Sequence, residues 1–403
     1  MPYKHGAYGQ IIPAQDTLPP SGVATLPVYI GTALEGDTGV PILVNSFDEA
    51  KEAVGYSDNW ATFTLCEAIY AHFRNSIQPM GPIVLINVYD PDVHLPGKEE
   101  GVAVSGTDII EGLAALDLIY EKTGMVPTIL AAPGWSHIPT VYAALISKCQ
   151  AKINGKWNAV CAVDIDSTST GAKTKADAIT WKDINEYSSD FAKVCWPKGK
   201  FGDLTFWLST LTVVRMQQTD YLNDNTPYVS PSNKPVMVSG LVCEDGTVVS
   251  IDEKNGNDLN AKGITTAIYG GGRWRLWGPH MGNYDATADV DIDKVFDAGS
   301  RMMHYLNNTF LVRYMAEVDN PMSRREIDTI LNDAQVWLNA LVSEGKLLFA
   351  EIQFNETSNP LGDIIQGDFV FDVRHTLTPI GKSLTFKIQY TTQGLSTLFG
   401  GDQ

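Results

Sequence analysis

The sequence predicts an α/β protein with an α+β domain at its C-terminal end and an extended arm at each terminus. Between residues 23 and 270, near-continuous apolar strands are separated by helices, which is typical of a mostly parallel sheet covered by helices. Between residues 271 and 390, two amphipathic helices precede alternating strands, which indicates a domain of helices and antiparallel sheet. Residues 1–22 and 391–403 cannot bury a core of their own and are predicted to be arms.

Strands and helices are predicted to alternate through the first of these domains. In chain order they are a strand at 27–31, helices at 47–54 and 62–75, a strand at 83–88, a helix at 107–121, a strand at 127–131, a helix at 138–151, a strand at 159–164, a helix at 173–179, a strand at 191–196 and a helix at 205–223. The turn-rich run 227–235 follows, and the polar stretch 244–263 is predicted to be a loop or a small insertion.

Two amphipathic helices define the C-terminal domain. The stripe of the first is Ile292, Val295, Phe296, Met302, Met303, Leu306 and Phe310, and that of the second is Ile327, Ile330, Leu331, Ala334, Trp337, Leu338 and Leu341. Ser323 and Glu326 predict a capping box at the start of the second helix, and Gly345 stands where a helix stop belongs.

A half-buried strand is predicted near the C-terminal end of this domain. Leu384, Phe386, Ile388 and Tyr390 alternate with Ser383, Thr385, Lys387 and Gln389, which is the period of a strand with one buried face. The C-terminal domain is therefore interpreted as a rigid platform that holds a strand and a free end where another molecule can reach them.

The composition is that of an ordinary globular protein, with 403 residues of which 44% are hydrophobic and 10% aromatic. No window approaches the run of about 18 apolar residues in a membrane helix, and residues 1–6 carry no secretory signal, so we expect no membrane insertion and folding in a cytoplasm. The formal net charge of -18 argues against nucleic acid as a partner, because phosphate binding needs clustered Lys and Arg. That charge is interpreted as a source of solubility or as repulsion between copies, and the two interpretations are compatible.

No catalytic, cofactor-binding or metal-binding residue is predicted. The run 381–383 resembles the end of a phosphate-binding loop, but the first glycine of such a loop is replaced by Thr376. The run 289–293 resembles the start of a calcium loop, but Lys294 and Ser300 stand where Gly and Glu are required. The five cysteines are widely spaced and are expected to be buried, reduced thiols.

An α/β enzyme or ligand-binding protein that uses the carboxyl edge of the sheet stays open as an alternative. Asp90, Asp164 and Asp166 follow predicted strands, and open α/β sheets bind ligands at that edge. Asp164 and Asp166 are interpreted either as a metal-linked pair or as the turn formers and helix caps that such residues more often are. No nucleophile motif and no His/Cys cluster accompanies them.

Four segments of the chain resemble contractile tail sheath proteins of bacteriophages. They are HGAY at 5–8, PVYIGTA at 27–33, TILAAPG at 128–134 and GRWRLWG at 272–278. The Asp-rich helix start near residue 291 and the tail after Tyr390 also fall where that family has them. The resemblance spans nearly the whole chain and depends on the order and spacing of these motifs together.

The resemblance implies a structural protein that is not an enzyme and has no cofactor. It implies a helical homo-polymer of stacked rings that surrounds a tail tube and shortens to drive the tube through a bacterial envelope. The implied partners are other copies of the chain, the tail tube protein, and the baseplate and tail terminator proteins. The implied location is a virion that is assembled in the host cytoplasm. Residues 23–270 correspond to the outer body and 271–390 to the inner, tube-facing domain of such a subunit, and the short connection 90–101 implies no extra protruding domain.

The resemblance also assigns roles to individual residues. The arms are implied to add strands to the sheets of neighbouring subunits, with ordinary frayed termini as the alternative. The residues predicted to make these contacts are Tyr3, Tyr8, Ile11, Ile12, Leu395, Leu398 and Phe399. The candidates for facing an acidic tube are Arg324, Arg325, Lys294 and Arg313, with solvated helix-surface charge as the alternative.

Overall fold

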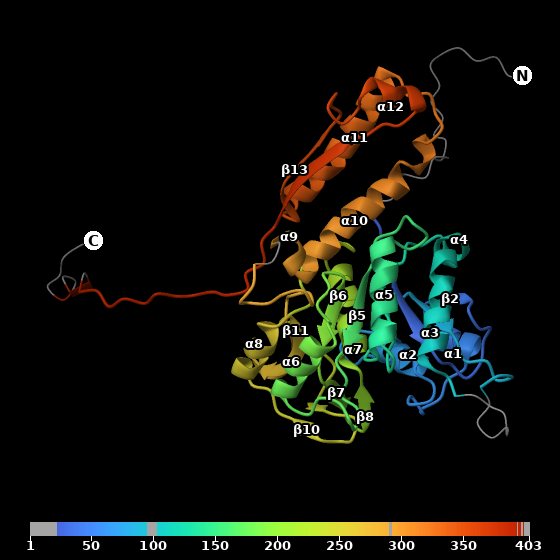
Figure 1. Ribbon diagram of the computed structural model, residues 1–403. Helices are drawn as coiled ribbons and strands as arrows, with labels where there is room; N and C mark the ends of the chain where they lie inside the picture. Colours follow the sequence, from blue (N-terminus) through green and yellow to red (C-terminus); the bar gives the residue numbers. More distant parts are fainter. Residues whose placement is uncertain (1–21, 95–102, 290–291, 393, 396–397, 399–403) are drawn as a thin grey trace, which may run out of the picture.

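The computed structural model describes residues 22–94, 103–289, 292–392, 394, 395 and 398. Figure 1 shows a body, coloured from blue to yellow, and a C-terminal unit, coloured orange and red, that stands on it. A segment of chain leaves the C-terminal unit and runs away from the rest of the molecule (Figure 1).

The body is built on an eight-stranded sheet that is mostly parallel, as the sequence predicts. The strand order is β12-β11-β6-β5-β4-β1-β3-β2, and only the outer pairs β2–β3 and β11–β12 are antiparallel. The strands are β1 (Pro27–Gly31), β2 (Pro41–Val44), β3 (Ile83–Asn87), β4 (Ile129–Ala131), β5 (Val160–Asp164), β6 (Ala192–Cys195), β11 (Ile264–Gly270) and β12 (Arg273–Trp277). Strands β1, β3 and β5 are wholly buried, which explains their near-continuous apolar sequences.

Helices cover both faces of this sheet. Alternate residues of β1 enter two different cores, Val28 and Ile30 on one face and Tyr29 on the other. The helices of the body are α1 (Phe47–Val54), α2 (Leu65–Phe73), α3 (Gly106–Gly112), α4 (Ile119–Thr123), α5 (Pro139–Ala151), α6 (Lys175–Ile184), α7 (Leu208–Tyr221) and α8 (Glu253–Asn260). The single helix predicted at 107–121 is instead α3 and α4 joined by a 3-10 helix (Leu113–Leu118).

A small antiparallel sheet completes the body. Its strands are β7 (Lys198–Phe201), β8 (Leu204–Phe206), β9 (Gly240–Val242) and β10 (Val248–Val249), in the order β10-β9-β7-β8. The stretch 244–263, predicted to be a loop or a small insertion, is not a simple loop, because it contains β10 and α8. Asp252 caps α8 by accepting a hydrogen bond from the Asn255 amide (2.7 Å), so the helix begins in a sequence with little apolar content.

The C-terminal unit packs helices against a two-stranded antiparallel sheet. Its elements are α9 (Ile292–Val295), α10 (Asp297–Arg313), a 3-10 turn (Met315–Glu317), α11 (Arg324–Ser343), β13 (Leu347–Gln353), α12 (Leu361–Gln366) and β14 (Asp372–Leu377). The predicted stripes supply its core, with Met302 and Leu306 from α10 and Trp337, Leu338 and Leu341 from α11.

The two ends of α11 bear out one prediction and correct another. Gly345 adopts a φ of +72°, which ends the helix and turns the chain toward β13 as predicted. The predicted capping box is wrong, since Ser323 occupies the N-cap position but its side chain makes no capping hydrogen bond.

The strand predicted over 383–390 is wrong for the single chain. Leu384, Phe386, Ile388 and Tyr390 are 77%, 82%, 96% and 81% exposed, and the described residues pair no strand with this segment. A strand forms only where a second strand satisfies its main-chain donors and acceptors. The alternation is present, but its pairing partner is not in the described part of this chain.

The domain division predicted at residue 271 falls inside the β11–β12 hairpin. Gly271 and Gly272, with φ of +59° and +80°, form the turn, and β12 pairs with β11 in the large sheet. The hydrogen-bonded sheet of the body therefore continues to Trp277. Among the described residues, no helix combines the length and the apolar composition needed to cross a bilayer. The five cysteines are buried and unbridged, as predicted.

Candidate interaction site on the C-terminal unit

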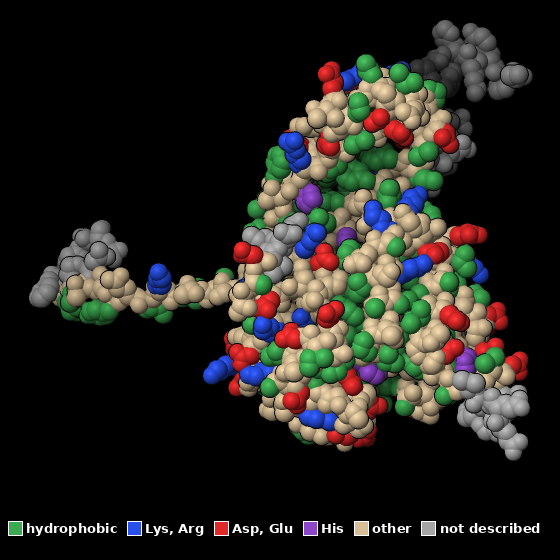
Figure 2. Space-filling model, in the orientation of Figure 1, with side chains coloured by type: hydrophobic (Ala, Val, Ile, Leu, Met, Phe, Trp, Pro, Cys, Tyr) green, Lys and Arg blue, Asp and Glu red, His purple; other side chains and the backbone are tan. Residues whose placement is uncertain are grey.

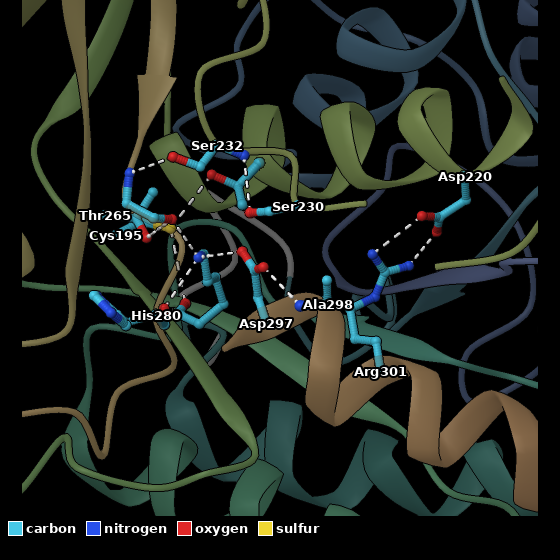
Figure 3. Close-up of polar contacts among 12 residues, drawn as sticks. Cys195, Asp220, Ser230, Ser232, Thr265, His280, Asp297, Ala298 and Arg301 are labelled. Carbon is cyan, nitrogen blue, oxygen red and sulfur yellow. Dashed lines mark hydrogen bonds and ion pairs between the residues drawn. The ribbon is translucent and has the colours of Figure 1, made fainter. Parts of the chain in front are cut away.

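Helix α10 is the stem that joins the C-terminal unit to the body, and a buried ion pair fixes its first turn (Figure 3). The Lys193 ammonium, on β6, donates to the Asp297 carboxylate (2.6 Å) and to the carbonyl oxygens of Gly278 (2.6 Å) and His280 (3.0 Å). Neither charged side chain is exposed to solvent. Burial and the nearby positive charges of Lys193 and Lys382 lower the pKa of His280 to about 3, so this ring beside the pair is neutral.

A second buried pair holds the stem one turn further on. The Arg301 guanidinium pairs with the Asp220 carboxylate of α7, and the Thr25 hydroxyl donates to the same carboxylate (2.6 Å). Burial raises the pKa of Asp220, and the positive charge of Arg301 opposes that rise. Further along, the Asn308 side chain accepts from the Asn158 amide (2.9 Å). Because separating any of these groups leaves a buried charge or dipole without a partner, the stem has one orientation on the body.

An apolar groove runs between the stem and β14. It consists of two adjoining hollows of about 910 and 850 Å³ that share Met303 of α10 and His375 of β14. Leu306, Phe310 and Phe371 are among the residues that line the first hollow. Figure 2 shows hydrophobic side chains gathered in a hollow of the C-terminal unit. Exposed apolar surface of this extent is typical of places where proteins bind another molecule.

The groove lies where the sheet stops short of the helices beneath it. The Phe310 and Trp337 rings meet at 5.2 Å between centroids, and Arg313 pairs with Asp333 (2.9 Å), so α10 and α11 are neighbours. Two packed helices, each about 10 Å wide, form a layer about 20 Å wide, and strands about 4.8 Å apart would need about four members to cover it. The described residues supply two, β13 and β14, and β13 lies on α11. Room for about two more strands is therefore present beside β14, over α10.

The chain leaves β14 as an extended segment whose first residues are held against the subunit. The Thr378 hydroxyl donates to the Gly345 carbonyl oxygen (2.8 Å). The Lys382 ammonium lies 5.5 Å from the centroid of the Tyr284 ring and 3.4 Å from its hydroxyl. Residues 383–392 are exposed and run away from the subunit, with hydrophobic side chains along one side (Figures 1 and 2). We call residues 378–392 the extension.

The residues predicted to make arm contacts are only partly described. Tyr3, Tyr8, Ile11, Ile12 and Phe399 lie outside the described residues. Leu395 and Leu398 are 48% and 76% exposed. The described chain begins beside the stem, where the Val23 amide donates to the Thr309 hydroxyl (3.2 Å). The roles of these seven residues stay predictions.

Two of the four basic residues predicted to face a tube lie together at the start of α11. Arg324 is exposed and pairs with Asp328 one turn along the same helix (2.8 Å), and Arg325 beside it is exposed as well. Exposed pairs of this kind contribute at most about 1 kcal/mol, so both side chains can exchange partners readily.

The other two lie elsewhere and are already paired. Arg313 is only 8% exposed and is held by Asp333 (2.9 Å). Lys294 lies near the body, 3.8 Å from Asp190. The structure therefore does not bring the four basic residues into one surface, and their contact with a tube stays a prediction.

The carboxyl edge of the large sheet holds the three carboxylates of the enzyme alternative. Asp164 is 2% exposed and accepts from the Ser209 amide (2.9 Å), from the Ser209 hydroxyl and from the Ser136 hydroxyl (3.2 Å), so it caps α7. Burial raises its pKa to about 6. Asp90 and Asp166 each accept from the main-chain amide two residues ahead, which is the bond of an Asx-turn. All three carboxylates therefore act as a cap and as turn formers.

Curated proteins similar to this chain share one description, although no family model matches it. They include the tail sheath protein of Burkholderia phage BcepMu (24% identical over 74% of this chain), the major tail sheath protein of Serratia phage KSP20 (26% over 44%) and the tail sheath protein of Escherichia phage P2 (25% over 71%). The relatives of this chain are tail sheath proteins. The resemblance predicted from the sequence is thereby confirmed. The aligned part spans 63%, 43% and 69% of these relatives, so it covers less than two thirds of the first two.

Solved contractile sheaths share the fold. The sheath complex of an extracellular contractile injection system, PVC, in the contracted state superposes with a TM-score of 0.67 at 13% identity, over 97% of this chain and 100% of that one. The helical sheath of the anti-feeding prophage in the contracted state gives a TM-score of 0.63 at 17% identity, over 96% and 99%. At these identities the likeness establishes the fold, with its large, mostly parallel sheet and smaller antiparallel sheets.

Sequence reasoning missed the groove, and it predicted as a strand a segment that pairs with no described strand of the single chain. The stripe of the stem helix, with Met303, Leu306 and Phe310, was a signal for the groove, because too few strands were predicted to cover it. Pro379 and Gly381 were a signal for the extension, since they separate the alternating segment from the strand before it.

Proposed function

We propose that this chain is the structural subunit of a contractile tail sheath. Copies of it polymerise into a helical array of stacked rings around a tail tube, and the array shortens to drive the tube through a bacterial envelope. The relationship to phage tail sheath proteins and the fold shared with contracted sheaths support this function. In this role the chain is not an enzyme, and it contacts the tube protein and, at the ends of the array, the baseplate and tail terminator proteins.

The observation that carries the proposal is a matched pair of incomplete elements in one chain. Residues 384–390 of the extension have the alternation of a half-buried strand, and no described strand pairs with them. The groove beside β14 has an apolar floor on α10 and room for additional strands. We infer that the extension of one subunit pairs with β14 of a neighbour and places its apolar side chains in that neighbour's groove.

The apolar part of the extension and the groove have similar lengths. Residues 384–390, fully extended, span about 20 Å at about 3.3 Å per residue. The groove follows α10 from Ala298 to Tyr314, about 24 Å at 1.5 Å per residue. Four apolar side chains on one face of the extension therefore fit along the groove in a single register. The second open strand position is suited to the predicted N-terminal arm of residues 1–22, because Val23, which follows that arm, contacts Thr309 of the stem.

Donation to a neighbour is favoured over folding back on the same subunit. The Thr378 and Lys382 contacts hold the start of the extension against Gly345 and Tyr284, and the chain beyond them points away from its own groove (Figure 1). Because donor and acceptor are different surfaces, the contact repeats from copy to copy and generates an open helical array. A flexible strand link also keeps neighbours connected while the subunits change their arrangement.

The shortened array must have the lower free energy for contraction to proceed unaided. Additional burial between neighbours is the source we infer, at about 25 cal/mol per Å² of apolar surface. The fixed stem supports this mechanism, since the Lys193–Asp297 and Arg301–Asp220 pairs make body and C-terminal unit move as one piece. Motion is then confined to the links between subunits.

The test compares the two faces of the extension in the purified chain by electron microscopy. One variant carries Ser in place of Leu384, Phe386, Ile388 and Tyr390, and the matched control carries Ser in place of Thr385, Lys387 and Gln389. We expect sheath-like tubes from the wild type and the control, and soluble subunits with an unchanged circular dichroism spectrum and melting temperature from the apolar-face variant. Tubes from the apolar-face variant would contradict strand donation, and a chain that forms no polymer under any condition would contradict the sheath assignment itself.

A further inference from the structure

The outer edge of β13, away from β14, is occupied by a side chain. Gln335 of α11 donates from Nε2 to the Ala350 carbonyl oxygen (3.1 Å) and accepts at Oε1 from the Ile352 amide (3.1 Å). Successive residues of a strand direct their main-chain groups to opposite edges, so Ala350 and Ile352 share one edge and Glu351 faces the other. The Ile352 amide has a single hydrogen and gives it to Gln335, so the main-chain groups of Ala350 and Ile352 point away from β14. Glu351, which is directly opposite Arg374, then directs its main-chain groups to β14, and the Gln335 amide lies on the edge that β14 does not use.

The amide imitates one peptide group of an added strand. A primary amide offers one acceptor and two donors, and here one donor and the acceptor meet main-chain groups two residues apart on β13. The second donor is taken by Asn339 Oδ1 (2.9 Å) on the same helix. The orientation of the amide is set by the acceptor and the donor on β13, and Asn339 takes only the spare hydrogen, so the edge is satisfied by the subunit's own Gln335 side chain.

The other half of this edge is irregular. The pairing of β13 with β14 shifts register between Leu347 and Phe349, and Leu348 and Phe349 are 56% and 48% exposed there. A bulge twists an edge and breaks the regular row of donors and acceptors that an incoming strand needs. Outer β13 is thus protected by a bulge at its beginning and by Gln335 further on, whereas β14 borders the apolar groove.

We propose that Gln335 is a specificity-determining residue for assembly, because it blocks the outer edge of β13 and confines strand addition to β14. The inference rests on the proposed function, in which neighbouring subunits donate strands to this unit. A subunit with one acceptor edge extends an array in a single direction and register. A subunit with two acceptor edges would also pair strands in a second register and branch, which is the hazard that protected edges avoid.

Disulfide trapping with the full-length chain, kept below its polymerisation concentration, tests which edge accepts a strand. One acceptor carries Glu351→Cys on β13 and the other Arg374→Cys on β14, two positions directly opposite each other on one face of the sheet. The probes are synthetic peptides of sequence KSLTFKIQYTT, residues 382–392, with cysteine replacing Thr385, Lys387 or Gln389. A disulfide needs Cβ atoms about 4 Å apart, which adjacent strands approach and strands two places apart, about 10 Å, do not. The native cysteines are buried, so they do not compete.

We expect Arg374→Cys to be trapped by at least one peptide whether or not Gln335 is present. We expect Glu351→Cys to be trapped only when Gln335 is replaced, with at least a tenfold rise in cross-linked product for Gln335→Ala and for Gln335→Leu, which keeps the volume of the side chain. Asn339→Ala, the matched control on the same helix, leaves both edge contacts of Gln335 in place and is expected to show no such rise.

Equal trapping of Glu351→Cys with and without Gln335 would overturn the inference. So would the absence of any rise in a Gln335 variant whose melting temperature and circular dichroism match those of the wild type. Failure of Arg374→Cys to be trapped by any peptide counts instead against strand addition to β14, and so against the proposed function, because the comparison at position 351 is scored separately.

Discussion

Truncation of Phe386 measures how much free energy one side chain of the extension contributes to assembly. In the single chain this ring is 82% exposed, so removing it leaves the folded subunit almost unchanged. In a neighbour's groove it would be fully buried, which stabilises by about 1.5–3 kcal/mol for a side chain of this size. Each subunit donates one extension, so the loss counts once for every subunit added. At 1.4 kcal/mol per factor of ten, Phe386→Ala is expected to raise the critical concentration for polymerisation about 10- to 100-fold.

Sedimentation of the purified chain over a range of concentrations gives the critical concentration directly. Lys387→Ala is the matched control, because its side chain lies on the opposite face of the extension and is predicted to stay in solvent. Its expected effect is below about 0.5 kcal/mol, or about a twofold change in critical concentration. Thermal melting of both variants below that concentration should coincide with the wild type.

Equal critical concentrations for Phe386→Ala and Lys387→Ala would refute the reasoning, because they would show that both faces of the extension stay in the same environment. A lower melting temperature for the unassembled Phe386→Ala subunit would refute it differently, since it would place the ring in a groove of its own subunit.

Three further predictions concern the groove, the stem and the body. Met303 lines both hollows of the groove, so Met303→Lys places a charge there. This variant should form no sedimentable polymer, whereas the melting temperature of the subunit should change little. Lys193→Met leaves Asp297 buried without its partner and should lower the free energy of unfolding in urea by about 3–5 kcal/mol, most of which the added change Asp297→Leu should restore. Burial raises the pKa of Glu67 from 4.5 to about 8, so the folded chain holds a proton that the unfolded chain releases, and this contribution to stability is lost as the pH rises from about 4.5 to about 8. Glu67→Gln should remove up to about 1.4 kcal/mol per pH unit of that slope, as measured by urea unfolding at pH 5, 6, 7 and 8.

The strands of the body could be predicted because the evidence that each is buried lies within its own sequence. Strands β1 and β5 are buried on both faces, so five consecutive residues of each carry the signal and no partner needs to be known. Helix α8 was missed for the opposite reason. Its start depends on the Asp252 cap, and its buried residues are Gly256, Leu259 and Asn260, which do not form a recognisable apolar stripe.

The interaction site was only half predictable. The stripes of α10 and α11 appear in the sequence, but how many strands cover two helices depends on pairing across the whole unit, which no local pattern contains. The contact of Gln335 with β13 could not be predicted from the sequence either. The partners of this glutamine are main-chain groups, which every residue has, and they belong to a strand that begins only after the helix ends. The basic residues were predicted from charge alone, whereas their positions depend on the elements that carry them. Arg313 ends α10 beside Asp333 and Lys294 lies near Asp190 of the body, whereas Arg324 and Arg325 begin α11.

The extension shows what a period of two does and does not specify. Alternation of Leu384, Phe386, Ile388 and Tyr390 with polar residues specifies that one face of a strand will be buried, and the same pattern serves a strand within its own sheet or one given to another chain. The difference lies in the connection, where the Lys382–Tyr284 contact holds the start of the segment and the chain beyond it runs outward (Figure 1). A strand that exposes its apolar face and a helix pair with too few strands above it are both unstable arrangements on their own, and each supplies what the other lacks.

A net charge of -18 keeps separate subunits apart at long range but is screened beyond about 10 Å at moderate salt, so it delays contact without opposing the short-range burial that strand addition brings. The proposed strand donation therefore treats the incomplete sheet as one half of an interface, which a second copy of this chain would complete.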